Sequence, residues 1–204
     1  MQQNYDAETV IRSPQYERPR FGWDAWLGVV GYIAEQHSPD ALLRVSLSAD
    51  AARSLKWNAS VRWGPYRETV KNQPALGSAL SELWHEVEDN HRIFWSHQDS
   101  VRRPIPYRAD SWLDDRSAAA LQSLINIGHR LFADDWQIVI VYQPSELSYA
   151  RVQTRILAAD YAVYRGGRGA TLRESCQTLY HNAIDLFTAH IQRISEHIAY
   201  EGIQ

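Results

Sequence analysis

Cysteine is almost absent from this 204-residue chain, which contains only Cys176. A single thiol cannot form a disulfide within the chain, and it cannot supply the several ligands of a cysteine-based zinc site. We therefore expect a protein of a reducing compartment, with the cytoplasm as the default. No apolar run approaches the roughly 20 residues of a membrane-spanning helix, and the polar start MQQNYDAETV lacks the apolar segment of a signal peptide. The sequence predicts no membrane partner.

A strong charge of one sign is also missing. The chain has 21 basic and 24 acidic residues, and its formal net charge is -3. Such a chain has no overall attraction for phosphate, so binding of a nucleic acid would need a local basic cluster. Large apolar side chains are plentiful, with eight Trp and eleven Tyr in a composition that is 45% hydrophobic. A chain of this length can bury roughly 70% of its unfolded surface, so we expect a stable globular core.

The first 20 residues contain polar residues and two prolines without a sustained apolar period. We expect residues 1–20 to form an N-terminal arm. From Trp23 onward, apolar residues recur at helical spacing, which predicts a helix over about 23–37. Gly28 and Gly31 lie inside this helix, where each costs on the order of 1 kcal/mol relative to alanine. We expect a neighbouring backbone to pack closely against these two glycines.

Apolar and polar residues alternate in the segments that follow. In WNASVRW, residues 57–63 alternate between an apolar and a polar face, as in a half-buried strand. The same period of two occurs before it in LLRVSLS, and a turn at Gly64-Pro65 leads into YRETV. An apolar stripe then predicts a helix over roughly 75–97. The first unit should therefore have the order helix, three antiparallel strands, helix.

The same order of elements follows a polar segment, residues 98–110, which is the predicted linker. Ser111 with Asp114 fits a capping box for the next helix. Thr171 with Glu174 fits the cap of a last helix that runs almost to the end of the sequence and would be about 45 Å long. The strands predicted between these two helices are WQIVIVYQ, RVQTRIL and YAVY.

Two helical segments match each other, ELWHEVED at residues 82–89 and TLYHNAID at residues 178–185. Their Leu, His and Asp positions coincide at a shift of 96 residues, and the strands upstream align at a shift of about 93. Agreement in element order, spacing and helix pattern predicts an internal duplication. We therefore expect an α+β fold of two tandem helix–three-strand–helix units with antiparallel sheets. The predicted parts are an arm at 1–20, a first unit at 21–97, a linker at 98–110, and a second unit with a long C-terminal helix at 111–204.

The matching positions define a candidate interaction surface of Trp84, His85, Asp89, Tyr180, His181 and Asp185. His85 and Asp89 are four residues apart on a helix and are therefore neighbours on its surface. Such a pair could ligate a metal or position a proton, or it could be solvated. A helix register centred on Leu83 turns His85 about 200° away from the buried stripe. We therefore assign no catalytic, cofactor-binding or metal-binding residue and expect no cofactor.

Two local clusters of arginine, RRPIPYR and YRGGRGATLR, could contact phosphate. In the second cluster a glycine-rich segment precedes a helix start, where free amides and the helix dipole favour anions. The alternative is an ordinary solvated turn, because the phosphate-loop pattern with its lysine is absent. The candidate anion contacts are Arg102, Arg103, Arg108, Arg165 and Arg168.

Two resemblances to known families accompany these patterns. The order helix, three strands, helix resembles the double-stranded-RNA-binding domain, and Gly64-Pro65 is similar to part of its strand–loop motif. The matching helix starts, PALGSAL and TLRESCQ, depart from that family because they lack its basic cluster. The segment GRGATLRESCQTLYHNAI resembles the turn and amphipathic helix of HicB-type antitoxins.

We expect a non-catalytic, cytoplasmic binding or adaptor protein that assembles with itself or with another protein. Its aromatic-rich helices, its N-terminal arm and its long last helix would provide the contacts. One alternative is a nucleic-acid-binding regulator of antitoxin type that uses the five arginines. Another is a metal-dependent enzyme centred on the two His–Asp pairs. The sequence favours a protein that is not an enzyme, and it identifies no particular partner.

Overall fold

The computed structural model describes residues 23–49, 54–90, 113–132, 136–158 and 166–201. The predicted arm and linker lie outside the described residues, as does the predicted strand YAVY, residues 161–164.

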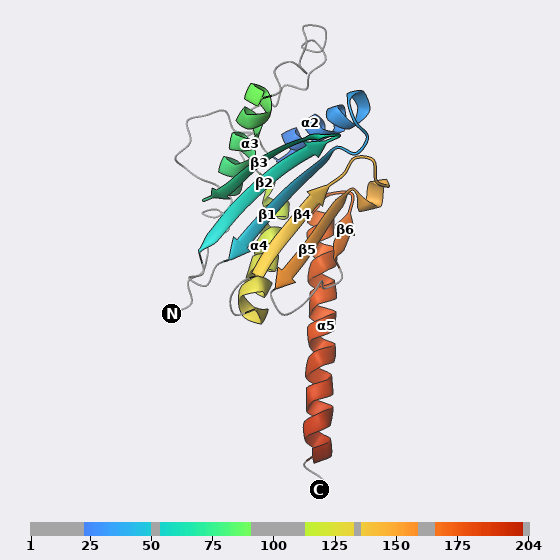
Figure 1. The fold of residues 1–204 in the computed structure, drawn as a ribbon. Coiled ribbons are helices and arrows are strands. Elements are labelled where there is room, and N and C mark those ends of the chain that lie inside the picture. Colours follow the sequence, from blue (N-terminus) through green and yellow to red (C-terminus); the bar gives the residue numbers. More distant parts are fainter. Residues whose placement is uncertain (1–22, 50–53, 91–112, 133–135, 159–165, 202–204) are drawn as a thin grey trace.

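Six strands form one antiparallel sheet in the order β3-β2-β1-β4-β5-β6. The first three strands and the last three therefore share a single sheet, which is joined where β1 pairs with β4. Figure 1 shows this sheet as one continuous twisted layer. The strands are β1 (Leu42–Ala49), β2 (Leu55–Trp63), β3 (Tyr66–Gln73), β4 (Trp136–Tyr142), β5 (Val152–Ala158) and β6 (Gly167–Gly169).

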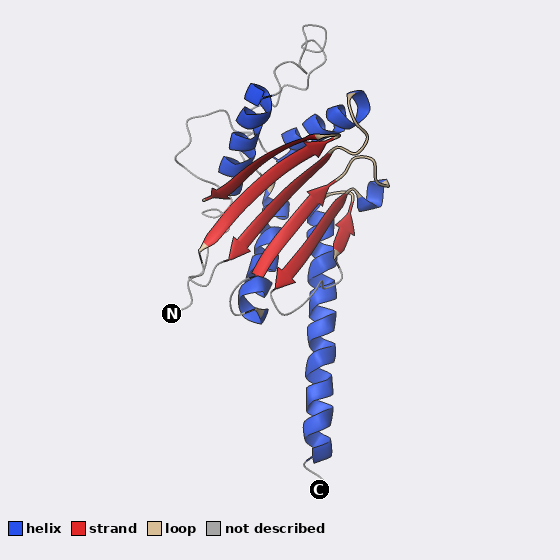
Figure 2. Cartoon of the chain, viewed as in Figure 1, coloured by secondary structure: helices blue, strands red, loops and turns tan. Residues whose placement is uncertain are grey.

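The α-helices in the described ranges lie behind one face of the sheet, and the opposite face is open (Figures 1 and 2). With the antiparallel sheet, this confirms the predicted α+β class. The helix α5 is longer than the sheet and continues beyond its edge, as its predicted length implied (Figure 1). The helices are α2 (Trp23–Gln36), α3 (Leu76–Asn90), α4 (Asp115–Leu131) and α5 (Leu172–Glu201).

The core lies between the sheet and the helices, because strands β1 to β5 turn most of their apolar side chains to the helix-covered face. Val45 of β1 and Trp57 of β2 are fully buried on this face. Trp26 of α2 joins them to α3, since its Nε1–H donates a 3.0 Å hydrogen bond to the carbonyl oxygen of Leu80. Its ring also meets that of Trp84 edge to face, with centroids 6.0 Å apart. Buried aromatic surface of this kind stabilises the packing of helices on a sheet.

The predicted N-terminal cap is observed at α5, whereas α4 is capped by a different residue from the predicted one. At α5, the Thr171 hydroxyl accepts a 3.2 Å hydrogen bond from the Glu174 N–H, as predicted. At α4, the cap is Asp114 and not Ser111, which lies outside the described residues. The Asp114 carboxylate accepts from two backbone N–H groups, each at 3.0 Å, because α4 begins one residue after it. A carboxylate at a helix N-terminus also interacts favourably with the helix dipole.

The glycine-rich segment before α5, for which the sequence left an anion contact and a solvated turn as alternatives, forms the edge strand β6 beneath that helix. A Cβ added at Gly167 would lie 2.7 Å from the Leu179 nitrogen, so only glycine allows this approach. Two buried hydroxyls join β6 to its neighbours: the Thr154 and Ser175 oxygens are 2.6 Å apart, and the Ser175 hydroxyl donates to the Gly167 carbonyl at 3.1 Å.

Within the described ranges, no backbone packs closely against Gly28 or Gly31, contrary to expectation. A Cβ added at either position would meet no atom within 4 Å in the described part of the chain. Close approach instead occurs at Gly128 of α4, where an added Cβ would lie 2.8 Å from the indole ring of Trp136. Among the described residues, no close contact offsets the cost in helix propensity that these two glycines carry in α2.

Candidate functional site

The two predicted His–Asp pairs lie in different parts of the structure. His85 is half-buried on α3, and His181 is exposed on α5, where its Nδ1 is 2.8 Å from the carbonyl oxygen of Gln177. Asp185 is exposed, and nothing is described of the Asp89 side chain. Because α3 packs behind β2 and β3 and α5 behind β5 and β6, at least three strand spacings, about 14 Å, separate the helices. Among the described residues, no group of three or more His, Cys, Asp or Glu could hold a metal ion.

The two aromatic residues of the predicted interaction surface, Trp84 and Tyr180, also differ in how deeply they are buried. Trp84 is 4% exposed and packs against Trp26, so its side chain belongs to the core. Tyr180 is half-buried against the core, and its ring centroid is 6.0 Å from that of His181. Trp84 and Tyr180 therefore each pack toward the core from their own helix, and together they do not form one continuous surface.

Of the five predicted anion contacts, the structure describes one. Arg168 is exposed on β6, where it lies opposite Gln153 of β5. Its neighbours Gly167 and Gly169 face α5, so the Arg168 side chain lies on the opposite face of the sheet. The predicted combination of this arginine with the start of α5 is therefore not formed. Arg102, Arg103, Arg108 and Arg165 lie outside the described residues.

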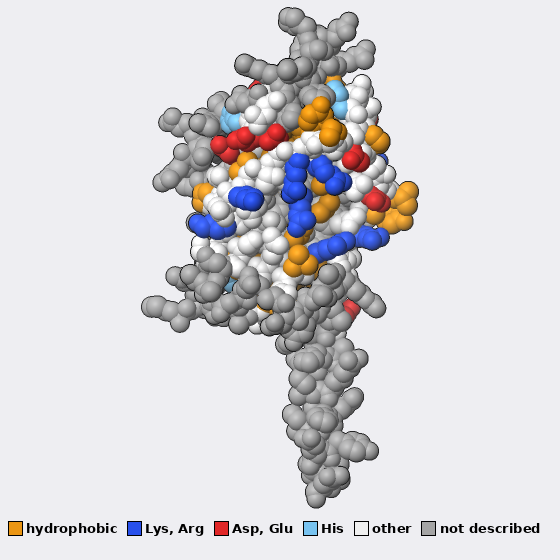
Figure 3. Space-filling view, in the orientation of Figure 1, with side chains coloured by type: hydrophobic (Ala, Val, Ile, Leu, Met, Phe, Trp, Pro, Cys, Tyr) orange, Lys and Arg blue, Asp and Glu red, His pale blue; other side chains and the backbone are white. Residues whose placement is uncertain are grey.

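The open face of the sheet carries a concentration of positive charge. Side chains alternate along each strand, so the residues between the buried ones project away from the helices. No Asp or Glu occupies such an outward position on any of the six described strands. Figure 3 shows this face, with blue basic side chains over the strands and red acidic side chains at the margins. The outward basic residues are Arg44, Lys56, Arg62, Arg67, Lys71, Arg155 and Arg168.

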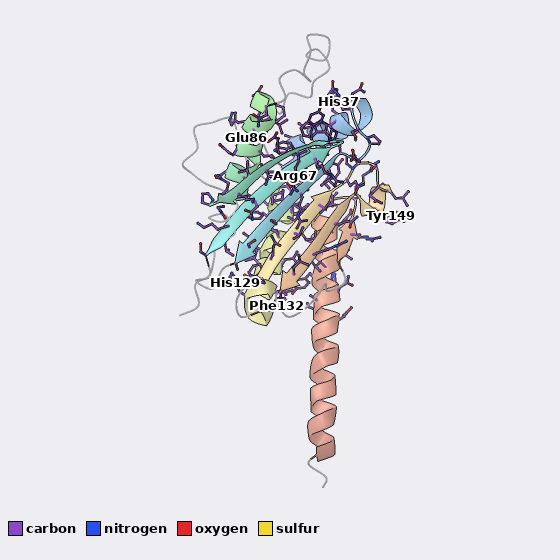
Figure 4. The ribbon with its side chains drawn as sticks, in the orientation of Figure 1. His37, Arg67, Glu86, His129, Phe132 and Tyr149 are labelled. Atoms are coloured by element: carbon purple, nitrogen blue, oxygen red, sulfur yellow. The ribbon has the colours of Figure 1, made fainter. Side chains whose placement is uncertain are left out.

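A shallow depression of about 370 Å³ lies over β1, β2 and β3 on this face. The strand register places Thr69, Ser60 and Arg44 directly opposite one another across the three strands. Cross-strand neighbours of this kind are about 5 Å apart. Figure 4 shows Arg67 over the same strands. The lining combines cations, hydroxyls and one amide: Arg44, Ser46, Asn58, Ala59, Ser60, Arg67, Thr69 and Lys71.

Two like charges face each other near this depression, because Arg62 of β2 pairs with Arg67 of β3. Directly opposed like charges destabilise a sheet. Asp40, in the loop before β1, offsets part of this effect. Hydrogen bonds from the Ser38 hydroxyl and the Gly64 N–H lower the pKa of Asp40, and the nearby charge of Arg62 lowers this pKa further. The carboxylate therefore stays ionised at the rim of the face.

Asn58 helps to shape the edge of the depression. Its side-chain oxygen accepts a 3.0 Å hydrogen bond from the N–H of Asn72, whose φ of 59° lies in the left-handed region. The pairing of β2 with β3 is irregular at this point, which is typical of a β-bulge. The bulge follows Lys71 directly, so it sets where that lysine lies on the edge strand.

The contiguous arginine clusters in the sequence include only one of the seven basic residues of this face, Arg168. The seven cations are spread from residue 44 to residue 168, usually with a single cation in any short stretch. The signal that could have revealed three of them is the alternation in β1 and β2, where Arg44, Lys56 and Arg62 occupy polar positions. Only the strand order then shows that they share one surface with β5 and β6.

No protein-family model, curated protein or solved structure matches this chain. None of the helices in the described ranges is long and apolar enough to cross a membrane. The basic face is therefore the feature from which a function can be argued.

Proposed function

We propose that this chain is a non-catalytic binding protein whose open sheet face binds a nucleic acid through its phosphates. One observation carries the proposal: seven outward basic side chains and no outward acidic side chain on the six strands. Lysine and arginine that neutralise phosphates release the counterions held by a nucleic acid, and this release drives sequence-independent binding. A nucleic acid is therefore the preferred partner, in place of the protein partner expected from the sequence.

The proposal is supported by where the charges lie on the protein, and not by the net charge of the chain. The chain as a whole is acidic, with a formal net charge of -3, yet a third of its 21 basic residues lie outward on the sheet. Lysine and arginine on edge strands can serve to prevent aggregation. That explanation applies to β3 and β6, but Arg44 lies on the central strand β1. A local positive field on an acidic protein is typical of a surface that attracts a polyanion.

Two observations support a non-catalytic role. Burial raises the pKa of the Cys176 thiol to about 12, so this side chain stays protonated and is a poor nucleophile. His85 and His181 lie on helices behind opposite edges of the same sheet face, and neither has the other as a partner for acid–base chemistry. The polar side chains that line the depression on the basic face are arginine, lysine, serine, threonine and asparagine, which suit binding of phosphate.

The direct test is the binding of fluorescently labelled oligonucleotides, single-stranded and duplex, measured by anisotropy over a series of salt concentrations. We expect binding at low salt that weakens with a log–log slope of about -0.7 to -0.9 for each phosphate contacted. Polyglutamate of matched charge serves as the protein-like polyanion. The proposal fails if neither oligonucleotide binds at low salt, or if polyglutamate binds as tightly as both.

A second candidate function is assembly with itself or with another protein of the cytoplasm through α5. The observation that favours it is the extension of α5 beyond the sheet (Figure 1). This helix has 30 residues and is therefore about 45 Å long. The mass of the full chain in solution should exceed that of one copy, and a chain that ends at Phe187 should be monomeric. A monomer in both cases rules out self-assembly through this helix.

We also infer that the two halves of the fold arose by duplication. The element order α-β-β-β-α occurs twice, and the sheet order is the same when read outward from the β1–β4 junction. A twofold axis through that junction would set one residue, the one on the axis, directly opposite its own counterpart. Ser46 and Val139 are paired there, and they are 93 residues apart, which is the shift that aligns the strands of the two units in sequence. The inference would explain how one open face extends over both units.

A further inference from the structure

Within the proposed function, we propose that the depression over β1–β3 is the anchoring site for a phosphate group, and that the β4–β6 half of the face contributes little affinity. We call the three cations that line it, Arg44, Arg67 and Lys71, the anchor residues. They come from two strands separated by β2, and their side chains border the same depression. Three cations around one hollow provide a stronger local field than three cations spread over a flat surface.

The floor of the depression is polar, although it is nearly closed to solvent. Ser46 is 6% exposed and Ser60 is 8% exposed, and both lie on the open side of the sheet. Thr69 lies directly opposite Ser60 on β3. Hydroxyl groups donate readily to phosphate oxygens, and arginine adds paired donors of fixed geometry. The site therefore offers both charge and hydrogen-bond donors to an oxyanion.

The other half of the face differs at the corresponding rows. Val141 lies opposite Arg44, and Val139 lies opposite Ser46, so apolar side chains replace the hydroxyls next to the β1–β4 junction. Arg155 lies across Gly166, where an added Cβ would be 3.0 Å from its Cγ and 3.6 Å from its Nε. This arginine is thereby directed toward the β6 edge. The β4–β6 half thus has fewer donors near the centre of the face.

The composition of the face also bears on what the site recognises. No Phe, Tyr, Trp or His occupies an outward position on the six described strands. Sheet surfaces that bind unpaired bases present aromatic side chains for stacking. The anchoring site should therefore hold the phosphate of any nucleotide with little preference for the base.

The test compares two triple variants with the same loss of charge. The anchor variant carries Arg44→Gln, Arg67→Gln and Lys71→Gln. All three positions are exposed, so the fold should persist, which circular dichroism and thermal unfolding would check. We expect this variant to bind a labelled oligonucleotide at least about tenfold more weakly at low salt, with a salt slope smaller by about 3.

The matched control variant carries Lys56→Gln, Arg155→Gln and Arg168→Gln on the same face. It also loses three positive charges, but all of them lie outside the depression. We expect the salt dependence of its oligonucleotide binding to have a slope smaller by about 1 or less. Equal losses in the two variants, or a larger loss in the control, would overturn the inference while leaving nucleic-acid binding intact.

Inorganic tripolyphosphate, titrated by calorimetry, separates the anchoring site from the proposed function. If the wild-type chain binds tripolyphosphate but no oligonucleotide, and only the anchor variant loses that binding, the anchoring site stands and nucleic-acid binding falls. If the wild-type chain binds neither ligand at low salt, both proposals are overturned.

Discussion

Replacement of Gly167 by alanine should strongly destabilise the protein, because β6 touches the backbone of α5. An added Cβ would lie 2.7 Å from the nitrogen and 2.9 Å from the Cβ of Leu179, and it would overlap the carbonyl oxygen of Ser175. Overpacking a core costs about 1–3 kcal/mol when side chains can yield, and occasionally more. Two backbone atoms of a helix cannot rotate away, so we expect a loss of at least about 3 kcal/mol in the free energy of unfolding.

Thermal and urea unfolding measure this loss. For a chain of this size, each kcal/mol lost from the free energy of unfolding lowers the thermal unfolding midpoint by about 2–4 °C. A loss of about 3 kcal/mol should therefore lower this midpoint by roughly 6–12 °C. Gly31→Ala is the matched control, since an added Cβ there meets no atom within 4 Å among the described residues. Alanine should stabilise α2 by about 1 kcal/mol. A loss below about 1 kcal/mol at Gly167 would refute the close packing of β6 beneath α5.

Three further changes test the caps and the core. Asp114→Ala should cost about 1 kcal/mol at neutral pH. Hydrogen bonds from Ser117 lower the pKa of Asp114, so urea titrations should show this cost vanishing as the pH falls through that lowered pKa. Partial desolvation and the charge of Asp114 raise the pKa of Asp24, although its side chain is largely exposed, so Asp24→Asn should raise the unfolding temperature only slightly at neutral pH and leave it unchanged below the ordinary range of aspartate. Trp26→Phe removes the buried hydrogen bond to the Leu80 carbonyl and should cost about 2–3 kcal/mol in urea unfolding.

Much of the fold follows from local patterns. The alternation over residues 57–63 places Trp57 and Val61 on one face, and both are fully buried in β2. Thr171 and Glu174 cap α5 because a hydroxyl at that position can accept a free N–H, which is a property of a few neighbouring residues. Strands with a buried face and helices with a local cap can therefore be predicted from the sequence.

The strand β6 could not be predicted in this way. Its residues, Gly167–Gly169, have no apolar alternation, and glycine weakens a strand. The strand exists because Ser175 and Leu179 of α5 pack directly on its backbone, and this contact depends on the position of the whole helix. The general lesson is that an edge strand formed by close backbone approach leaves no pattern of side chains.

The candidate binding face shows the same limit. Arg44 stands alone between Leu43 and Val45, Lys71 follows Val70, and neither segment stands out as basic. They become neighbours through the order β3-β2-β1 and through the register that sets Arg44 opposite Ser60. The predicted arginine clusters contain only Arg168 of this face, because residues that are close in the folded sheet need not be close in the sequence. Strand order and register must be known before such a face can be recognised.

Titration of isotopically labelled protein with a single-stranded oligonucleotide at low salt, followed by amide NMR shifts, tests the central claim most directly. The account predicts that the largest shifts occur on β1–β3 around Arg44, Ser60 and Arg67, and that added salt reverses them. Shifts confined to α4 and α5, or no shifts at all, would contradict the assignment of the open sheet face as the binding surface.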